Sequence, residues 1–494
     1  MRPQVRRRAL LPALSKSFKV YDIDRIHPTL PSPAYVMNPL LREGHIRDGF
    51  FVAEDQVVLK SIVTSASTPD DVSQVAFVRA GPRQHIFYRP DDVTAAIVTC
   101  GGIAPGINTV IRELVSSLEH QYGVKTIYGV PDGFRGFYSH LEESGGLEFG
   151  WLKLTAKDVA QIHTQGGTFL RSCRGGMDPD KIVDALERSG VNMLFIVGGD
   201  GTMRGGSVLY DAAKKRGFNL SVVGIPKTVD NDIPLIDKSF GFESAVEEAQ
   251  KAVAAAAVEA RSLSNGIGIV QLMGRNSGFI ALHSTLASRE VDCVLIPEVK
   301  FGVGELIKYV EGRLTANNHA VIVIAEGAGQ EHVAAHKNVD KTVGKHDASG
   351  NKIIDDVGSW LSHEMKSYFA SPRCLLKPTP TVKFINPTYM LRSVKANSAD
   401  SVYCTTLAFS AVHGAMAGYT NFVVGPINSH NVYVPLDLIF GSINKVSTSD
   451  EIWARTIFST GQPDFSPYKE CSKSAADTTV YGGCTVSREQ RSTQ

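Results

Sequence analysis

The sequence has almost no net charge, because 51 lysines and arginines balance 50 aspartates and glutamates and leave a formal charge of +1. No field of one sign therefore covers the molecule to attract nucleic acid or an anionic membrane, and any anion site has to be local. The sequence also lacks an apolar run that approaches the ~18–20 residues of a membrane span. We therefore expect a soluble protein without nucleic-acid or membrane partners.

Cysteine is scarce and does not occur in metal-binding patterns. Seven cysteines are scattered along 494 residues, without a Cys-x-x-Cys pair or a metal-ligand spacing with histidine. This pattern is typical of reduced thiols in a reducing compartment, and we expect a cytoplasmic protein. The first 20 residues are basic and contain no acid, which leaves a plastid or another organelle as the alternative. Because serine is sparse there, we favour a solvated basic tail over a targeting segment.

The length of the chain exceeds what one hydrophobic core usually organises, so we expect at least two domains and a cleft. Residues 1–92 show no clean periodicity and contain several prolines. They predict a loosely structured N-terminal extension that is free to pack on a partner subunit. Residues 466–494 are polar and poor in apolar side chains, which predicts a disordered tail.

From Thr94 the chain repeats a pattern of apolar run, polar loop and helical periodicity. Six short apolar runs begin such units: 95–99, 193–197, 220–225, 267–272, 292–296 and 320–325. This repetition predicts α/β domains with mostly parallel sheets and helices on both faces. Ligands of open α/β sheets bind beyond the carboxyl ends of the strands, which is where the polar loops of this sequence fall.

Two glycine-rich loops follow predicted strands. Residues 101–106 offer backbone amides and a helix N-terminus that suit phosphate, although a turn of purely geometric origin explains them equally well. In the loop 198–202, Asp200 suits Mg²⁺ held between a carboxylate and phosphate oxygens, and Thr202 can donate to phosphate. A tight Asp-Gly turn is the alternative. The second loop also resembles those of NAD kinases and lipid kinases, so it indicates a kinase without identifying its substrate.

The loop 226–232 adds two carboxylates, spaced by two residues and placed directly after a strand. An aspartate beside a bound hydroxyl accepts its proton during attack on a γ-phosphate, and we assign this role to Asp230. Asp232 holds metal through water or orients Asp230. A bland Asp-Asn-Asp turn is the alternative interpretation.

Five segments resemble, in order and spacing, the motifs of phosphofructokinases: 101–108, 198–202, 226–232, 273–278 and 324–327. The resemblance runs from about Thr94 to Pro463, and 412–418 is similar in particular to the ATP-dependent plant-type branch. It implies two Rossmann-like domains with the active site in the cleft between them. It also implies glycolytic transfer of the γ-phosphate of Mg-ATP to the 1-hydroxyl of fructose 6-phosphate. An allosteric homotetramer, or a hetero-oligomer with relatives, is the implied assembly.

The resemblance further implies which residues belong to each domain. The nucleotide-binding domain would cover 93–232, with part of about 388–410 returning to it. The sugar-phosphate-binding domain would cover 233–387, continued by about 411–465.

The site residues also follow from the resemblance, with Thr228, Asp230 and Arg275 as the catalytic ones. Those implied at the nucleotide, its phosphates and Mg²⁺ are Gly102, Arg174, Gly175, Gly199, Asp200, Gly201 and Thr202, with Asp200 as the metal ligand. Those implied at fructose 6-phosphate are Thr228, Val229, Asp230, Met273, Gly274, Arg275, Glu326, Tyr389, Met390, Leu391 and Arg392. Taken singly, Arg392 and Glu326 are better explained by structural salt bridges. Lys383 is a weaker candidate for phosphate contact.

Gly201 and Lys227 report the phosphoryl donor. In the pyrophosphate-using branch an aspartate stands at the position of Gly201 and opposes an α-phosphate, whereas a lysine at the position of Lys227 helps to hold pyrophosphate. Repulsion between an aspartate and an α-phosphate affects the choice of donor more than an additional lysine does. The glycine at position 201 therefore predicts ATP. A pyrophosphate-dependent enzyme is the alternative.

Three residues depart from the family pattern. Arg171 stands where relatives commonly have glycine, Cys173 replaces serine or alanine, and Ala104 replaces cysteine or aspartate. A guanidinium beside the nucleotide would add a contact or crowd the site. A catalytically weak regulatory subunit therefore stays open, although the clustered carboxylates of Asp200, Asp230 and Asp232 argue against it.

Overall fold

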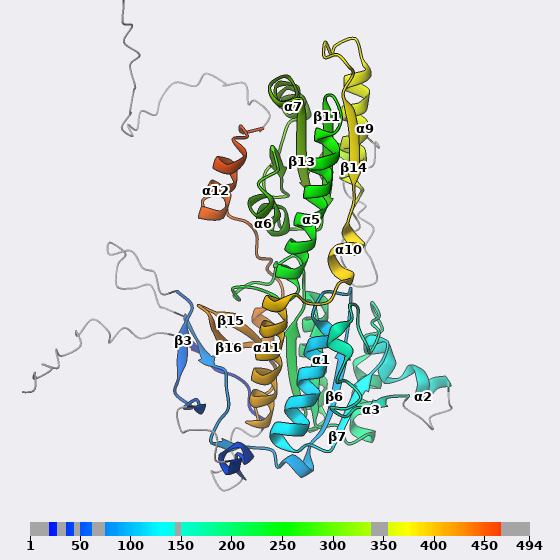
Figure 1. Ribbon diagram of the computed structural model, residues 1–494. Coiled ribbons are helices and arrows are strands. Elements are labelled where there is room, and N and C mark those ends of the chain that lie inside the picture. The colour runs from blue at the N-terminus through cyan, green and yellow to red at the C-terminus, as the bar shows by residue number, and fades with distance from the viewer. Residues whose placement is uncertain are drawn as a thin grey trace, which may run out of the picture.

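The computed structural model describes residues 19–26, 36–43, 50–61, 75–143, 150–336 and 354–465. The predicted tail at 466–494 and the basic segment before residue 19 lie outside these ranges. The described chain forms two large sheets with helices on both faces, and Figure 1 shows one sheet above the other. The predicted α/β class with two domains is confirmed.

The larger sheet has ten strands, in the order β1-β4-β16-β15-β10-β9-β6-β7-β8, with β3 added on β4. Its central strands are parallel and apolar: β6 (Thr94–Thr99), β9 (Met193–Gly198) and β10 (Ser221–Pro226). Side chains of a strand alternate between the two faces. Ala95 and Ile97 accordingly pack in one core, and Ala96 and Val98 pack in the other. The strands are apolar throughout because both faces are covered.

Helices cover this sheet on each side. One face carries α1 (Ile107–Ser116) and α11 (Ser398–Met416), which pack against each other, and the opposite face carries α3 (Pro179–Arg188) and α4 (Asp200–Lys215). Beyond β6 the sheet continues through β7 (Thr126–Val130) to β8 (Leu152–Lys153), and the short α2 (Ser139–Glu143) lies between these strands in sequence.

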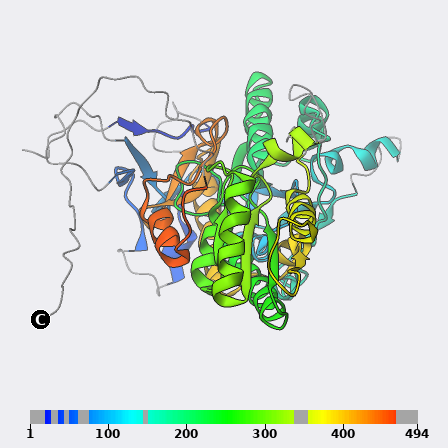
Figure 2. The same cartoon turned by 90° about the horizontal axis from the view of Figure 1, so that it is seen from above.

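The smaller sheet has four parallel strands in the order β12 (Cys293–Leu295), β13 (His319–Ala325), β11 (Gly266–Leu272) and β14 (Thr381–Ile385). One face is covered by α5 (Phe242–Arg261) and α6 (Phe279–Ser288), and the other by α7 (Val303–Asn317) and α9 (Val357–Ala370). The short helices α8 (Gln330–His336) and α10 (Thr388–Ser393) follow β13 and β14 in the chain. Seen from above in Figure 2, α5 lies near the centre of the molecule. It contacts α11 of the larger sheet as well as β11, so it joins the two halves.

The expectation of a loosely structured N-terminal extension is wrong for its described part. β4 (Val75–Arg79) pairs with β1 (Lys19–Tyr21), with β3 (Val57–Leu59) and with β16 of the larger sheet. A further pair joins β2 (Val36–Met37) to β5 (His85–Ile86). These strands are too short for their periodicity to be recognised, and β4 joins the larger sheet through β16, more than 300 residues later in the chain.

The expected division after residue 411 is also wrong. β15 (Phe422–Ile427) pairs in parallel with β10, and β16 (His430–Pro435) pairs antiparallel with β15, so both strands belong to the larger sheet. Of the described chain after α11, α12 (Glu451–Thr460) is the helix that packs on the smaller-sheet half, against α6. An apolar run indicates a strand, but it does not indicate which sheet edge accepts it.

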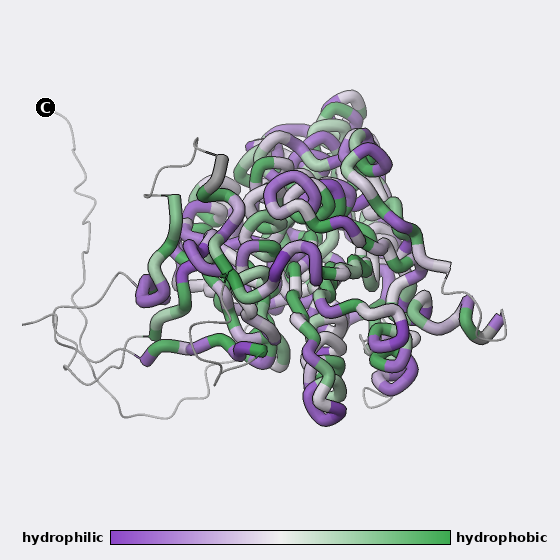
Figure 3. The backbone as a smooth tube through the Cα atoms, turned by 90° about the horizontal axis from the view of Figure 1, so that it is seen from below, coloured by the Kyte–Doolittle hydropathy of each residue, from purple (hydrophilic) through white to green (hydrophobic). Residues whose placement is uncertain are grey.

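Hydrophilic and hydrophobic stretches alternate along the backbone in Figure 3. Among the described residues, we find no helix that combines the length and apolar character needed to span a bilayer.

Candidate active site

A cleft of ≈ 460 Å³ lies where loops from the two sheets meet. Most of the predicted site residues line it: Gly102, Arg174, Gly175, Gly199, Asp200, Gly201, Thr202, Lys227, Thr228, Val229, Asp230, Met273, Arg275, Glu326 and Arg392. They come from the carboxyl ends of β6, β9, β10, β11 and β13, together with the segments 173–175 and 388–392. The larger sheet thus supplies the glycine-rich wall, and the smaller sheet supplies the wall with Arg275 and Glu326.

Four predicted residues are placed differently. The side chains of Tyr389 and Met390 are exposed, whereas Leu391 is buried in the apolar core and offers the cleft no side chain. The ring of Tyr389 lies 4.9 Å from the Arg392 guanidinium. Gly274 has φ +133°, and its carbonyl accepts a hydrogen bond from Gly327 N–H. Lys383, the weaker candidate for phosphate contact, pairs with Glu259 at 2.9 Å and does not line the cleft.

Asp200 begins α4, with Gly199 as the residue before it. The unpaired N–H groups and the dipole of a helix N-terminus favour negative charge at this position. The carboxylate is 57 % exposed and lies 3.9 Å from Arg204. Burial raises its pKa, while Arg204 and the nearby Gly441 backbone act in the opposite direction. No cluster of three or more metal-ligating side chains occurs in the described ranges. The donor set nevertheless fits Mg²⁺, which commonly uses one or two carboxylates together with substrate phosphates.

Asp230 lies in the loop 226–232 after β10 and lines the cleft. Burial raises its pKa well above the usual aspartate range, and the negative charges of Asp232 and Glu326 raise it further, while Arg275 acts in the opposite direction. Its Oδ1 atom is buried and has no hydrogen-bond partner among the described residues. An acceptor that is unsatisfied in this way is costly unless a ligand completes it.

Thr228 connects the two aspartates of the loop. Its hydroxyl donates to Asp232 Oδ1 at 3.0 Å and accepts from the Asp230 N–H at 3.2 Å. Asn231, between the aspartates, has φ +57° and accepts from the Ser239 N–H. The loop is therefore held by its own side chains in a shape that leaves Asp230 Oδ1 free.

Lys227 is 7 % exposed, and its ammonium donates to the carbonyl oxygen of Gly102. Burial, together with a smaller contribution from Arg174, lowers its pKa to about 8. Lys227 thus links the loop 226–232, to which it belongs, with the loop 101–106. Arg174 faces the same glycine, since a Cβ on Gly102 would lie 3.8 Å from its Nη2.

Glu326 and Arg392 both line the cleft. Burial raises the pKa of Glu326, and the nearby Arg275 and Arg392 partly offset this shift. The Nε atom of Arg392 is buried without a hydrogen-bond partner within the described chain. These observations give no support to structural salt bridges as the explanation of Glu326 and Arg392. They agree better with binding of an anionic ligand.

The segment 439–446 was not found from the sequence. Its residues Ile439, Ser442 and Ile443 line the cleft. Asn444 donates through its backbone to Asp232 O at 2.8 Å and through its side chain to Asn231 O at 3.3 Å. The segment carries no recognisable motif, because it contacts the loop 226–232 largely through backbone groups that the fold brings there.

Arg171 does not crowd the cleft. Its φ is +58°, its side chain is 67 % exposed, and its guanidinium pairs with Asp132 at 3.0 Å, away from the lining residues. Glycine adopts such positive φ angles readily, which explains why it suits this position in relatives. Cys173 and Ala104, the other two departures, do line the cleft.

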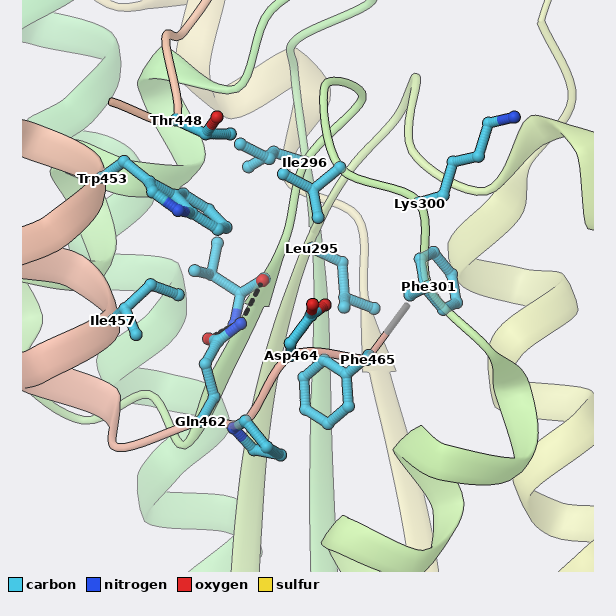
Figure 4. Close-up of a pocket in the computed structure, with 13 residues that line it drawn as sticks. Leu295, Ile296, Lys300, Phe301, Thr448, Trp453, Ile457, Gln462, Asp464 and Phe465 are labelled. Atoms are coloured by element: carbon cyan, nitrogen blue, oxygen red, sulfur yellow. Dashed lines mark hydrogen bonds between the residues drawn. The ribbon is translucent and has the colours of Figure 1, made fainter. Parts of the chain in front are cut away.

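A second cavity, of ≈ 350 Å³, lies between α12 and the end of β12. Figure 4 shows Trp453 and Ile457 from α12 on one side and Leu295, Ile296 and Phe465 on the other. The side chain of Gln462 also lines this cavity. It accepts a hydrogen bond from the N–H of Val294 and donates one to the carbonyl of the same residue. None of the predicted site residues lies there.

Comparison with known proteins agrees with the cleft chemistry. The phosphofructokinase family model matches residues 94–415. Over 459 residues the chain is 48% identical to ATP-dependent 6-phosphofructokinase 4, chloroplastic, from Arabidopsis thaliana, covering 92% of this chain and 83% of that protein. It is 42% identical over 437 residues to an ATP-dependent 6-phosphofructokinase from Borreliella burgdorferi, covering 86% and 94%.

Among solved structures, a pyrophosphate-dependent phosphofructokinase from Marinobacter aquaeolei aligns with a TM-score of 0.59 at 17% identity, over 76% of this chain and 94% of that chain. At this identity the likeness concerns the fold alone. The family match over most of the chain carries the assignment, and the chain belongs to the phosphofructokinase family.

Proposed function

We propose that this protein transfers the γ-phosphate of ATP to the 1-hydroxyl of fructose 6-phosphate and releases fructose 1,6-bisphosphate and ADP. The observation that carries the proposal is the convergence of Asp200, Asp230 and Arg275 from both sheets in one cleft. The relatives named ATP-dependent 6-phosphofructokinase, at 48% and 42% identity, support the same reaction.

ATP is proposed to occupy the glycine-rich wall. Its phosphates would meet the N-terminus of α4, the backbone at 199–201 and the Thr202 hydroxyl, with Gly102, Arg174 and Gly175 on the opposite side. Mg²⁺ held by Asp200 would neutralise charge on the phosphates as the reaction proceeds. Arg174 suits phosphate because a guanidinium donates two parallel hydrogen bonds.

Asp230 is proposed as the base that accepts the proton of the sugar 1-hydroxyl. Its unsatisfied Oδ1 and raised pKa suit this task, since a general base works best with a pKa close to the working pH. Arg275 would stabilise the charge that develops on the transferred group. Thr228 can share this role only if its hydroxyl exchanges Asp232 for phosphate.

The sugar phosphate is proposed to bind the wall from the smaller sheet. Glu326 would accept hydrogen bonds from sugar hydroxyls, and Arg275 and Arg392 would hold the 6-phosphate. Met273 would pack against the sugar, while Val229, Gly274 and the residues 389–391 would contribute mainly backbone or adjoining contacts.

ATP rather than pyrophosphate is the proposed donor. Gly201 adds no side chain or charge beside an α-phosphate. Lys227 is tied to the Gly102 carbonyl, so its ammonium is engaged before any donor binds. Since Arg171 points away from the cleft, no observation favours a catalytically weak regulatory subunit.

A coupled assay of the purified full chain tests the proposal, with fructose 6-phosphate as acceptor and either Mg-ATP or Mg-pyrophosphate as donor. We expect turnover with ATP and at least tenfold slower turnover with pyrophosphate. Equal or faster turnover with pyrophosphate would reverse the donor assignment, and no turnover with either would reject the reaction.

The assembly and location are further proposals. A homotetramer, or a hetero-oligomer with relatives, would cover exposed apolar side chains such as Phe458, which is 86 % exposed, and Leu375, which is 85 % exposed. Light scattering on the purified chain gives the mass. Two similar relatives are named chloroplastic, so a plastid location stands beside the cytoplasm, and imaging of a C-terminal fluorescent fusion separates the two.

A further inference from the structure

Two cysteines lie side by side on the glycine-rich wall of the cleft. Cys100 and Cys173 are paired as parallel neighbours, and Gly101 N–H donates to Cys173 O at 3.1 Å. Paired residues of a parallel ladder point their side chains to the same face, and neighbouring strands lie ~4.8 Å apart. Disulfides join Cα atoms that are about 4.4–6.8 Å apart. Both thiols are free in this structure, although their backbones are close enough for a bond.

The two side chains also converge on one turn. Burial raises the pKa of the Cys100 thiol, and the nearby Phe134 backbone acts in the opposite direction. A Cβ placed on the adjacent Gly133 would lie 3.5 Å from the Cβ of Cys173. Cys100 thus lies near Phe134 and Cys173 near Gly133, which are adjacent residues of one turn, and this agrees with the shared face expected from the pairing.

The two cysteines differ in access. Cys100 is 4 % exposed, while Cys173 is only partly buried and lies at the cleft surface, with its thiol 3.4 Å from Arg174 O. A small oxidant can therefore reach Cys173 first, and Cys100 is placed to react second.

We propose that Cys100 and Cys173 are a reversible modification site, which a low-molecular-weight disulfide such as oxidised glutathione converts to an intramolecular disulfide. The Cys173 thiolate attacks one sulfur of glutathione disulfide, the sulfur–sulfur bond breaks, and one glutathione leaves as a thiolate that takes up a proton. The Cys100 sulfur then attacks Cys173 Sγ and displaces the second glutathione. Two protein thiols lose two electrons in total, and one glutathione disulfide becomes two glutathione molecules.

Lys227 assists the second step. Burial raises the pKa of Cys100 to about 12, so its thiol needs a base to react. Lys227 is the cation that acts most strongly on this thiol, and its own pKa is lowered to about 8. A neutral fraction of Lys227 can therefore take the proton as the Cys100 sulfur attacks.

The disulfide would act on the donor side of the cleft. Cys100 immediately precedes Gly101 and Gly102, and Cys173 immediately precedes Arg174, which faces Gly102. Joining the sulfur atoms draws the two strands together and displaces Arg174, so we expect weaker ATP binding. A bond between directly paired strands departs from relaxed geometry and is easily reduced, which makes the modification reversible. This consequence rests on the proposed ATP position, whereas the disulfide itself does not.

The test uses the full chain incubated with oxidised glutathione, followed by alkylation of free thiols and peptide mass spectrometry. We expect a Cys100–Cys173 cross-linked peptide that disappears with dithiothreitol and forms more slowly in the presence of ATP. Cys100→Ala should stop at a glutathione adduct on Cys173, and Cys173→Ala should form neither product. Cys293→Ala, which removes a buried thiol on β12 of the other sheet, should form the cross-link as the parent chain does.

A parent chain that keeps both thiols, or that retains glutathione on Cys173 without progressing, would overturn the proposal. The KM for ATP is measured before and after oxidation, with each variant compared with its own reduced form. We expect a rise of at least fivefold in the parent chain, reversed by dithiothreitol, and none in Cys173→Ala. A cross-link that leaves the KM for ATP unchanged would keep the modification site and count against the proposed ATP position.

Discussion

Asp230 has the features of a base, and the ionised form of its carboxyl destabilises the folded chain. Burial and two neighbouring carboxylates raise its pKa, so the folded chain binds its proton more tightly than the unfolded chain does. Folding stability from this group is therefore present at low pH and is lost as the pH rises from the usual aspartate range toward the raised pKa. With Asp230 as the proposed base, we expect activity to have the opposite dependence, because only the ionised carboxylate accepts a proton.

Asp230→Asn is expected to lower kcat by about 10²–10⁴-fold, which is the usual contribution of a general base, with little change in the KM for fructose 6-phosphate. The same variant should melt at a higher temperature than the parent at a pH where Asp230 is ionised. In the parent, kcat/KM should fall with decreasing pH at values above the usual aspartate pKa of ~3.9.

Steady-state kinetics and thermal melts across pH measure these effects. Asp211→Asn, which changes an exposed aspartate of α4, is the matched control and should alter neither activity nor melting temperature. Turnover of Asp230→Asn within fivefold of the parent would remove Asp230 from the base role.

The backbone of Arg171 is strained, because a non-glycine residue at φ +58° costs energy. Its side chain does not line the cleft. Arg171→Gly and Arg171→Ala both remove the ion pair with Asp132, and they differ mainly in this cost. We expect the glycine variant to be about 1 kcal/mol more stable than the alanine variant. Denaturant unfolding measures the difference. Both variants should keep the KM for ATP within twofold, and a larger change in the glycine variant would place Arg171 at the nucleotide after all.

At the scale of elements, the segment 439–446 connects loops that the chain separates widely. The Gly441 backbone lies close enough to Asp200 to oppose the rise in the pKa of its carboxyl, and Asn444 donates to the backbone of the loop 226–232. Glu298, after β12, accepts from the N–H groups of both Gly278 and Val446, which ties the segment to the smaller sheet as well. This segment therefore couples the position of Asp200, the proposed metal ligand, to that of the loop that carries Asp230, the proposed base.

Gly441→Ala tests this coupling. Gly441 has φ +94° and open space around the position of a Cβ, so alanine introduces backbone strain without a collision. We expect a loss of about 1 kcal/mol in unfolding free energy and a rise of threefold or more in the KM for ATP.

Gly461→Ala provides the matched control, since Gly461 also has positive φ, at +63°, and open space, but ends α12 away from the cleft. It should lose similar stability with an unchanged KM for ATP. If both variants change the KM equally, the effect comes from general destabilisation and the segment has no special role.

At the scale of the whole molecule, three strands before residue 93, β1, β3 and β4, are part of the larger sheet. Phe77 of β4 is fully buried and stacks on Tyr21 of β1, with ring centroids 5.4 Å apart. Phe77→Ala should therefore cost about 3–5 kcal/mol of unfolding free energy. Phe458→Ala, at an 86 % exposed position, should cost far less in dilute, dissociated protein. Chemical denaturation compares the two, and similar losses would show that β4 is not part of the cooperative core.

The sequence by itself determined the fold class, the family and nearly all of the cleft. Strands 94–99, 193–198 and 221–226 are apolar because both faces of a parallel sheet are buried, and their loops carry the glycine and carboxylate motifs. Only the tertiary structure decided that β4, β15 and β16 join the larger sheet, because strand pairing over hundreds of residues leaves no local pattern. It also decided that Arg171 turns away from the cleft and that Cys100 lies beside Cys173, since both depend on how two distant loops pack.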